Sequence, residues 1–164
     1  MSFAKSSLVI ISLLVSACTF QPLYTEDNVE DLSHIKVATI PEREGQLLRN
    51  ELIDLFVFNA NCPKKTYLLI VEPTYATKDI GVRRDATTSR KESMVSAVIK
   101  LKDLTTNHIV YTSSLSAQNS YVVGSNNFFA NVITEQEADK QTYRNLAKLI
   151  QLDVATYFAK AHAE

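Results

Sequence analysis

The sequence predicts an α+β domain in which two helices pack on one face of a four-stranded sheet. Two segments carry apolar residues at helical spacing, and four segments have the composition of strands. Their order along the chain is strand, helix, strand, strand, strand, helix. Each helix has a single apolar stripe, and the strands offer a face that can bury both stripes. Placing both helices on the same face of the sheet is therefore the simplest arrangement.

The composition is that of one globular domain. The chain has 164 residues, 46% of them hydrophobic, with 17 basic and 18 acidic residues and a net charge of −1. This balance argues against a general nucleic-acid-binding protein, which usually has a strongly basic surface. Three dispersed histidines and two distant cysteines do not form a Cys/His zinc site, and the sequence predicts no metal.

Residues 1–17 are expected to be a signal peptide and not part of the fold. Lys5 precedes the segment Leu8–Val15, in which seven of eight residues are apolar, and Ser16 and Ala17 follow. A basic start, a short apolar segment and small residues are typical of a secretory signal, and the segment is too short to span a bilayer. The alternative is a buried strand at the N-terminus.

The segment Val15-Ser16-Ala17-Cys18 resembles the lipobox of bacterial lipoproteins. The resemblance implies that Cys18 is lipidated and becomes the first residue of the mature chain. Several acyl chains would then anchor the protein to a membrane, because a single chain binds only marginally. Thr19 follows in place of the aspartate that favours inner-membrane retention, so outer-membrane delivery is expected. No cofactor other than this covalent lipid is expected.

Residues 18–33 are expected to form the lipidated N-terminus and an acidic tether, and residues 34–164 a single α/β sandwich domain. If Cys18 carries lipid, Cys62 has no partner for a disulfide within the chain. Cys62 is then expected to be a small, semi-buried residue before Pro63.

The first predicted strand spans roughly residues 34–40, and Pro41 ends it. The first helix follows, with two glutamates in its first turn and a stop at residues 59–63. Its apolar stripe comprises Leu48, Leu52, Leu55 and Phe56.

Three further strands are predicted, over residues 67–77, 89–101 and 108–123. Pro73 lies within the first of these and indicates an edge position or a bulge. The second alternates between apolar and polar residues, as expected of a strand with one solvated face. A polar turn at 103–107 joins it to the third, which predicts a β-hairpin.

The last helix is the longest predicted element, at about seven turns. Thr134 and Glu137 are spaced as a capping box at its start. The opposite face is expected to be charged and includes Lys140, Arg144, Lys148 and Asp153. Its apolar stripe comprises Tyr143, Leu146, Ala147, Ile150, Val154, Tyr157, Phe158 and Ala161.

The sequence does not predict an enzyme. It has no nucleophile elbow, phosphate-binding loop or zinc-protease motif. Glu135, Glu137 and Asp139 are close in sequence, but acidic residues at a helix start are more often there for the helix dipole than for catalysis. His108 is expected to be a surface residue of the hairpin turn.

A basic stretch between Lys78 and Lys102 stands out from the otherwise acidic chain. It contains seven basic and three acidic residues, a local balance of +4. Arginine side chains suit phosphate and carboxylate groups, so anionic lipid or glycolipid head groups are candidate ligands. The candidate contacts are Arg83, Arg84, Arg90 and Lys91. The alternative is a solvated hairpin with alternating charges.

Three motifs together resemble the LPS-assembly lipoprotein (LptE) family. They are Cys-Thr-Phe-Gln-Pro-Leu-Tyr from Cys18, the segment Ile40–Asn50, and a C-terminal part with Ser120-Tyr121, Phe129-Ala130 and Glu137-Ala138. The motifs cover almost the whole mature chain. One departure is Thr19, where the family commonly has glycine.

The resemblance implies a lipoprotein at the periplasmic side of the outer membrane, with two helices on a four-stranded sheet. It also implies that the chain binds as a plug inside the large β-barrel LptD, aids its assembly and helps to insert lipopolysaccharide at the cell surface. The family binds lipopolysaccharide through basic residues. The assignment of this role to the four basic residues above rests on local charge and not on the resemblance.

Gly45 and Arg49 are candidates for contact with the partner. Glycine near a helix start costs about 1 kcal/mol relative to alanine, so Gly45 indicates a close approach of backbone to the sheet or to the partner. Arg49 either contacts the barrel wall or pairs locally with Glu44, Asn50 or Glu51.

Two other functions remain open from the sequence. A solitary lipid-binding or lipid-shuttle lipoprotein would need an apolar cavity, for which the strands offer few lining aromatics. A membrane-anchored hydrolase would need one of the absent catalytic motifs.

Overall fold

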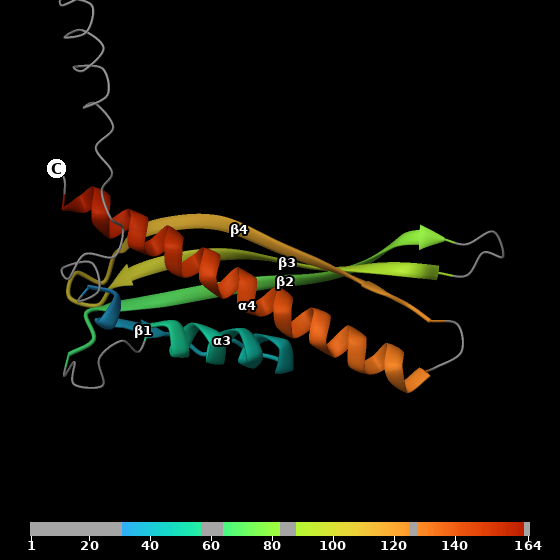
Figure 1. Ribbon diagram of the computed structural model, residues 1–164. Helices are drawn as coiled ribbons and strands as arrows, with labels where there is room; N and C mark the ends of the chain where they lie inside the picture. Colours follow the sequence, from blue (N-terminus) through green and yellow to red (C-terminus); the bar gives the residue numbers. More distant parts are fainter. Residues whose placement is uncertain (1–30, 57–63, 83–87, 125–127, 163–164) are drawn as a thin grey trace, which may run out of the picture.

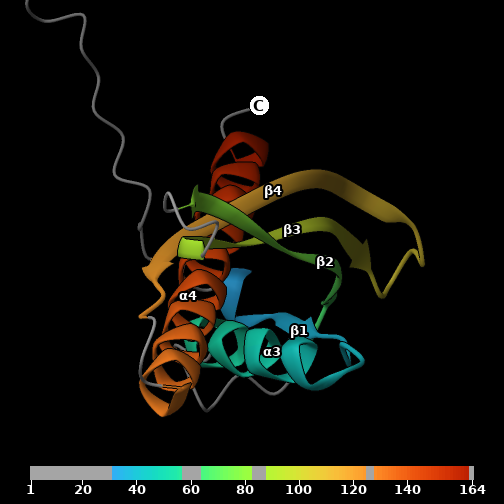
Figure 2. The ribbon, with the colours of Figure 1, turned by 90° about the vertical axis from the view of Figure 1, so that its right-hand side faces the viewer.

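Two helices lie on one face of a four-stranded sheet (Figures 1 and 2), so the predicted fold class is confirmed. The computed structural model describes residues 31–56, 64–82, 88–124 and 128–162. The element order also agrees with the sequence prediction. The elements are β1 (Ile35–Val37), α3 (Arg43–Phe56), β2 (Tyr67–Val82), β3 (Thr88–Asp103), β4 (Ile109–Val122) and α4 (Phe128–Ala161).

The sheet has the strand order β1-β2-β3-β4. The short strand β1 runs parallel to the first three residues of β2, as expected for strands joined through a helix. The strands β2, β3 and β4 form a long antiparallel meander. Among the described residues, β1 pairs only with residues 67–69 of β2, so no described strand borders the rest of β2 on that side, and β4 is the edge strand on the other side.

The core lies between the sheet and the two helices. The predicted alternation in β3 is confirmed, because Val95, Ala97, Ile99 and Leu101 are all buried. The apolar stripe of α3 is buried through Leu48, Leu52 and Phe56, while the central part of α4 buries Leu146, Ile150 and Val154. One continuous apolar cluster therefore holds both helices on the sheet.

The start of α3 depends on the close approach of two residues. Glu42 has a positive φ of 67°, so the backbone turns sharply just before the helix. A Cβ on Gly45 would lie 2.6 Å from Cγ2 of Ile40. Ile40 is fully buried, and only glycine leaves it room. The predicted close approach is therefore made to the segment between β1 and α3.

Pro73 lies where β2 forms the edge of the sheet, as the sequence predicted. The carbonyl of Leu69 accepts a hydrogen bond from Ala38, so the backbone groups of odd-numbered β2 residues point away from β3. The nitrogen of Pro73 therefore faces the free edge, and its missing N–H removes no hydrogen bond to Ala97, its partner position on β3. This explains how β2 continues to Val82, five residues beyond the predicted end.

The capping box predicted at Thr134 and Glu137 is wrong. The helix α4 begins at Phe128, so Thr134 lies in its second turn. The Thr134 hydroxyl donates to the carbonyl of Ala130, four residues back, as threonines inside helices do. The first turns of α4 lack buried apolar residues, and the helical spacing of apolar residues therefore starts later than the helix.

The turn between β3 and β4 confirms the predicted hairpin. The Asp103 carboxylate accepts hydrogen bonds from the amides of Thr105 and Thr106, and these bonds lower the pKa of Asp103. Asn107 takes a positive φ of 63°, a conformation that asparagine tolerates better than most residues.

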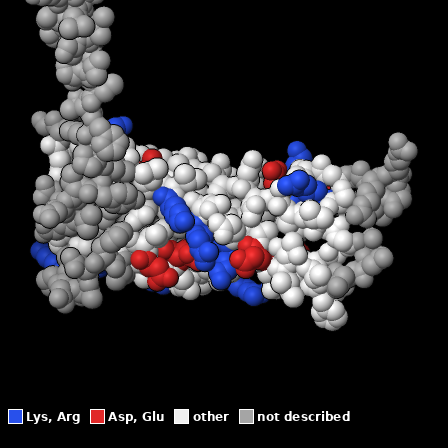
Figure 3. Space-filling view, in the orientation of Figure 1, with Lys and Arg blue, Asp and Glu red and all other residues white. Residues whose placement is uncertain are grey.

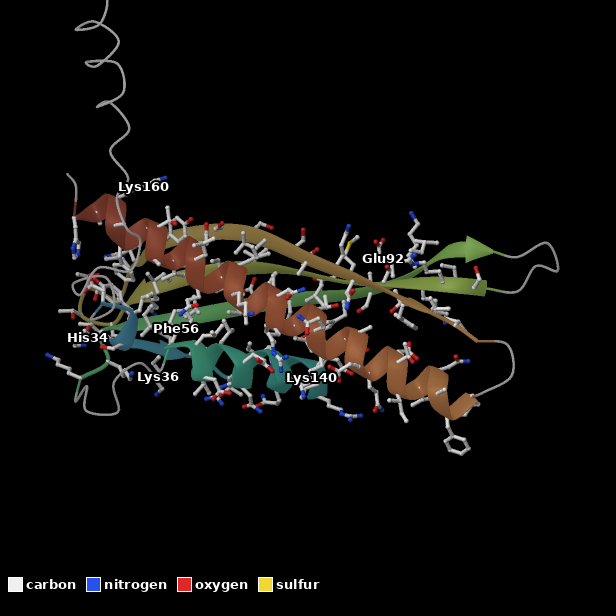
Figure 4. The ribbon with its side chains drawn as sticks, in the orientation of Figure 1. His34, Lys36, Phe56, Glu92, Lys140 and Lys160 are labelled. Atoms are coloured by element: carbon white, nitrogen blue, oxygen red, sulfur yellow. The ribbon has the colours of Figure 1, made fainter. Side chains whose placement is uncertain are left out.

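The molecule is elongated and has two distinct ends (Figure 1). At the end that we call the N-terminal end, β1 begins and α4 finishes, and His162 lies 2.8 Å from Asp31. Figure 4 shows His34 and Lys160 at this end. The end of β2, the start of β3 and the start of α4 lie at the opposite end, which we call the hairpin end after the strands β2 and β3.

Candidate ligand and partner surface at the hairpin end

Two of the four predicted basic contacts, Arg90 and Lys91, lie at the start of β3, near the hairpin end. Arg90 is exposed and donates two hydrogen bonds to the Ser120 hydroxyl on β4, at 2.7 Å and 3.1 Å. Lys91 is half-buried. Arg83 and Arg84 lie outside the described residues.

Opposite charges meet across the strands next to this pair. In the register of the sheet, Asp79 is opposite Lys91, and Lys78 is opposite Glu92. Cross-strand pairs of this kind favour a solvated hairpin with alternating charges, as one reading of the sequence proposed. Figure 3 shows basic side chains near the hairpin end, and acidic side chains lie beside them.

A groove of about 510 Å³ runs between the end of β4 and the first half of α4. Most of its side chains are polar, with Ile133 and Ala138 as the apolar members. The residues that line it are Asn119, Ser120, Tyr121, Ile133, Thr134, Glu137, Ala138 and Gln141. Arg90 borders this groove because it holds the Ser120 hydroxyl.

Polar contacts hold the two sides of the groove together. The Tyr121 hydroxyl donates to Glu135 at 2.9 Å, and Asn119 donates to the Ala138 carbonyl at 3.5 Å. Burial and the neighbouring carboxylate of Glu135 raise the pKa of Tyr121, so its hydroxyl stays protonated as a donor. Further along, Ser93 donates to Asp139 at 2.5 Å.

Exposed apolar side chains gather at the same end. Val122 is 62% exposed, Phe128 75%, Phe129 79% and Ile133 67%. The rings of Phe128 and Phe129 are 6.1 Å apart, edge to face. We call these four residues the apolar tip. Large exposed apolar groups close together are typical of a surface that meets a partner or a lipid.

The sequence reasoning did not single out the apolar tip as a surface. Phe129 belongs to one of the three motifs that resemble a known family. A usable signal is present, because Phe128, Phe129 and Ile133 are large apolar residues that lie before the predicted apolar stripe, which starts only at Tyr143.

The two candidate partner contacts, Gly45 and Arg49, lie on α3 and not at the hairpin end. Gly45 is buried against Ile40, so a contact within the chain accounts for it. The prediction that Arg49 pairs with a neighbouring residue of its helix is wrong. Its Nε donates to the carbonyl of Ala38 at 3.2 Å and ties α3 to the end of β1.

Cys18 and Cys62 lie outside the described residues, so the structure does not test the predicted lipidation. Of the helices that the structure describes, none is long and apolar enough to cross a membrane. Within the same residues, no group of three or more His, Cys, Asp or Glu side chains is placed to hold a metal ion.

Solved structures of bacterial lipoproteins share this fold. A candidate lipoprotein from Caulobacter crescentus CB15 matches with a TM-score of 0.68 and 25% identity, covering 82% of this chain and 97% of that one. The rare lipoprotein B from Shewanella oneidensis has a TM-score of 0.58 at 9% identity, covering 78% and 96%. A minor lipoprotein from Acinetobacter baumannii has a TM-score of 0.54 at 17% identity, covering 75% and 89%. No protein-family model and no curated protein sequence matches the chain.

Proposed function

We propose that the chain is an outer-membrane lipoprotein of the LptE family that acts by binding, without turnover. Lipid on Cys18 anchors it at the periplasmic side of the outer membrane. The folded domain binds inside the large β-barrel LptD as a plug, supports the assembly of that barrel and aids the insertion of lipopolysaccharide at the cell surface.

The observation that carries the proposal is the agreement between the N-terminal motif and the fold. The lipobox and the segment after Cys18 resemble the LptE family, and they precede a domain whose fold is shared with lipoproteins over nearly their full length. Neither observation depends on the other, because the lipobox lies outside the described domain.

The hairpin end supplies the surface for the proposed contacts. The apolar tip gives the barrel an exposed aromatic surface to cover. Arg90 and Lys91 are close in sequence to Arg83 and Arg84, and together they offer cations to the phosphates of lipopolysaccharide.

The alternative function is a solitary lipid shuttle, which would need an apolar cavity. The groove is the candidate cavity, and its lining mixes Ile133 and Ala138 with Glu137, Gln141 and other polar residues. The pull-down described next separates the two functions, because a solitary shuttle would bring down no barrel.

The first experiment is a mild-detergent pull-down of the full-length tagged lipoprotein from isolated outer membranes, followed by mass spectrometry. We expect a large β-barrel protein in equal amount. The variant Phe128→Ser/Phe129→Ser should recover at least tenfold less barrel. Ile109→Ser is the matched control, because Ile109 is 54% exposed at the N-terminal end. Recovery of lipidated protein without any barrel would contradict the plug function.

The proposed lipopolysaccharide contacts are tested separately. Reversing Arg83, Arg84, Arg90 and Lys91 to glutamate should weaken binding to lipopolysaccharide micelles and reduce the salt sensitivity of the remaining binding. Lys36→Glu/Lys160→Glu reverses two charges at the opposite end, as Figure 4 shows, and should bind as the parent does. Unchanged binding by the first variant would remove these residues from the site.

A further inference from the structure

The strand β4 is an unprotected edge of the sheet. It pairs with β3 on one side, and no described strand pairs with its other side. Its fourteen residues, Ile109–Val122, include no charged residue, no proline and no glycine. Natural sheets usually protect such edges with charges, prolines or bulges, because an open edge pairs with other strands.

The other free edge of the same sheet shows this protection. Beyond Leu69, where no strand that the structure describes borders β2 on that side, β2 carries Pro73, Lys78 and Asp79, and its register with β3 shifts at Gly81. One edge is thus blocked by a proline, charges and an irregular register, whereas the other, of similar length, has no proline and no charge and only a register shift near its first residues. We therefore take β4 to be an edge that is used for pairing.

One set of backbone N–H and C=O groups of β4 faces away from β3 and is available for pairing with another strand. The amide of Val123 donates to Ser89 on β3, so the odd-numbered residues of β4 exchange hydrogen bonds with β3. The even-numbered residues direct their N–H and C=O groups to the open edge. The pairing with β3 is regular from Tyr111 to Tyr121, and the one register shift lies beyond Leu101, opposite Tyr111.

The sequence of this regular part is nearly symmetric about Ser116. If Ser116 is placed opposite Ser116 of an antiparallel copy, every residue meets one of similar chemistry. The opposed pairs are Tyr111 with Tyr121, Thr112 with Ser120, Ser113 with Asn119, Ser114 with Gln118, and Leu115 with Ala117. Ser116 is even-numbered, so its backbone groups point to the edge, as a hydrogen-bonded pair on the twofold axis requires.

We propose that β4 pairs antiparallel with β4 of a second copy of this chain, about a twofold axis at Ser116. The two sheets join into one, and the helices of both copies lie on the same face. The outer face of the junction brings hydroxyl and amide side chains together, and the inner face brings Leu115 to Ala117. No like charges oppose each other along the junction.

The helix α4 also offers apolar surface beside this edge. Ala138 and Asp153 of α4 contact Asn119 and Tyr111 of β4. Helical spacing places Leu149 on the same flank, and it is 39% exposed. The pairing concerns the free chain and does not rest on the proposed function.

Disulfide trapping tests the pairing and its register together. The full mature chain is used in mild detergent, with Cys62→Ser as background and mass spectrometry of peptides to identify the linked residues. Ser116→Cys should link to itself. Ser114→Cys and Gln118→Cys should each link little alone, and at least tenfold more when the two proteins are mixed. Thr74→Cys is the matched control, because Thr74 is exposed on the same face, in line with Ser96 and Ser116, but lies two strands from β4, on the opposite edge of the sheet.

Sedimentation gives an independent measurement. Ser116→Lys places two ammonium groups against each other and should weaken self-association at least tenfold, whereas Thr74→Lys should leave it unchanged. Three results would each overturn the proposal: no linkage at Ser116→Cys, linkage of Ser114→Cys alone equal to that of the mixture, or linkage at Thr74→Cys equal to that at Ser116→Cys. Linkage of the β4 variants to a different protein in isolated membranes, without the homodimer, would also overturn it.

Discussion

At the scale of single residues, Gly45 shows how the backbone packing of α3 depends on one missing side chain. Replacing Gly45 with alanine gains about 1 kcal/mol of helix propensity. It also places a Cβ 2.6 Å from Cγ2 of Ile40, and Ile40 is fully buried and cannot move away freely. Since overpacking typically costs about 1–3 kcal/mol, we expect Gly45→Ala to lower the free energy of unfolding by about 1 kcal/mol, measured by urea denaturation.

Gly124→Ala is the control for this prediction. An added Cβ at Gly124 would lie 3.5 Å from Asn131, an ordinary contact distance, and Gly124 is exposed. We expect this variant to be neutral or more stable by up to about 1 kcal/mol. Equal effects of the two substitutions would mean that the contact with Ile40 does not matter.

Two residues show what local sequence can and cannot predict. Gly45 indicates a close approach, because a glycine in a helix lowers the stability of the helix. The residue that it approaches, Ile40, could not be predicted, because the backbone turn at Glu42 brings Ile40 to the helix. Arg49 was expected to pair within its helix and instead donates to the carbonyl of Ala38. Every residue has a backbone carbonyl, so the sequence alone does not indicate that the carbonyl of Ala38 accepts the hydrogen bond from Arg49.

At the scale of elements, the first ten residues of α4 are joined to the sheet through polar contacts and bury no side chain. None of them is buried, whereas ten residues from Ala138 to Phe158 are. The Asn131 side chain accepts from the Gly124 amide at 2.8 Å and donates to its carbonyl at 2.7 Å, which joins α4 to the end of β4. We expect amides of 128–137 to exchange hydrogen faster than those of 142–158, measured by mass spectrometry.

The variant Asn131→Ala should raise exchange in residues 128–137 severalfold and leave 142–158 unchanged, because it removes both bonds to Gly124. Asn145→Ala is the matched control on the same helix, where Asn145 accepts from Gln141 within α4. Equal exchange along the whole of α4 in the parent protein would show that burial does not set its local stability.

The sequence predicts helices and strands well where apolar residues recur at a regular helical or strand spacing, and it predicts the ends of these elements poorly. The alternation of β3 identified its buried face because every second side chain meets the helices. The start of α4 was missed because its first turns are exposed and carry no apolar stripe. The Thr134–Glu137 spacing also occurs inside helices, so it does not by itself mark a helix start.

At the scale of the whole molecule, the predicted site was found only in part. The charge pattern located Arg90 and Lys91 near the hairpin end. The groove and the apolar tip could not be predicted, because they form where β4 and α4 meet and each segment alone looks ordinary. Cross-strand register also pairs Lys91 with Asp79, which a count of charges along the chain does not show.

Asp139 lies where three elements converge, and it makes stability depend on pH. It accepts from Ser93 of β3 at 2.5 Å, and Glu44 of α3 and Glu135 of α4 add negative charge. Burial is the main reason that the pKa of Asp139 is raised above its ordinary value of 3.8, with the two glutamates adding to it and the Ser93 hydrogen bond opposing it.

The sign of the effect follows from proton linkage. As the pH rises past 3.8, the unfolded chain loses the Asp139 proton first, while the folded chain keeps it up to the raised pKa. The contribution of Asp139 to the free energy of unfolding therefore falls as the pH rises from 3.8 through the raised pKa, and it stays lower at higher pH.

We expect Asp139→Asn to be more stable than the parent at pH 7, with a difference that shrinks toward pH 4, in urea denaturation at each pH. Asp54→Asn, at an exposed carboxylate of α3, should show no such divergence. A constant difference between Asp139→Asn and the parent from pH 4 to pH 7 would contradict this role, because a carboxyl whose pKa is raised on folding makes the difference grow with pH.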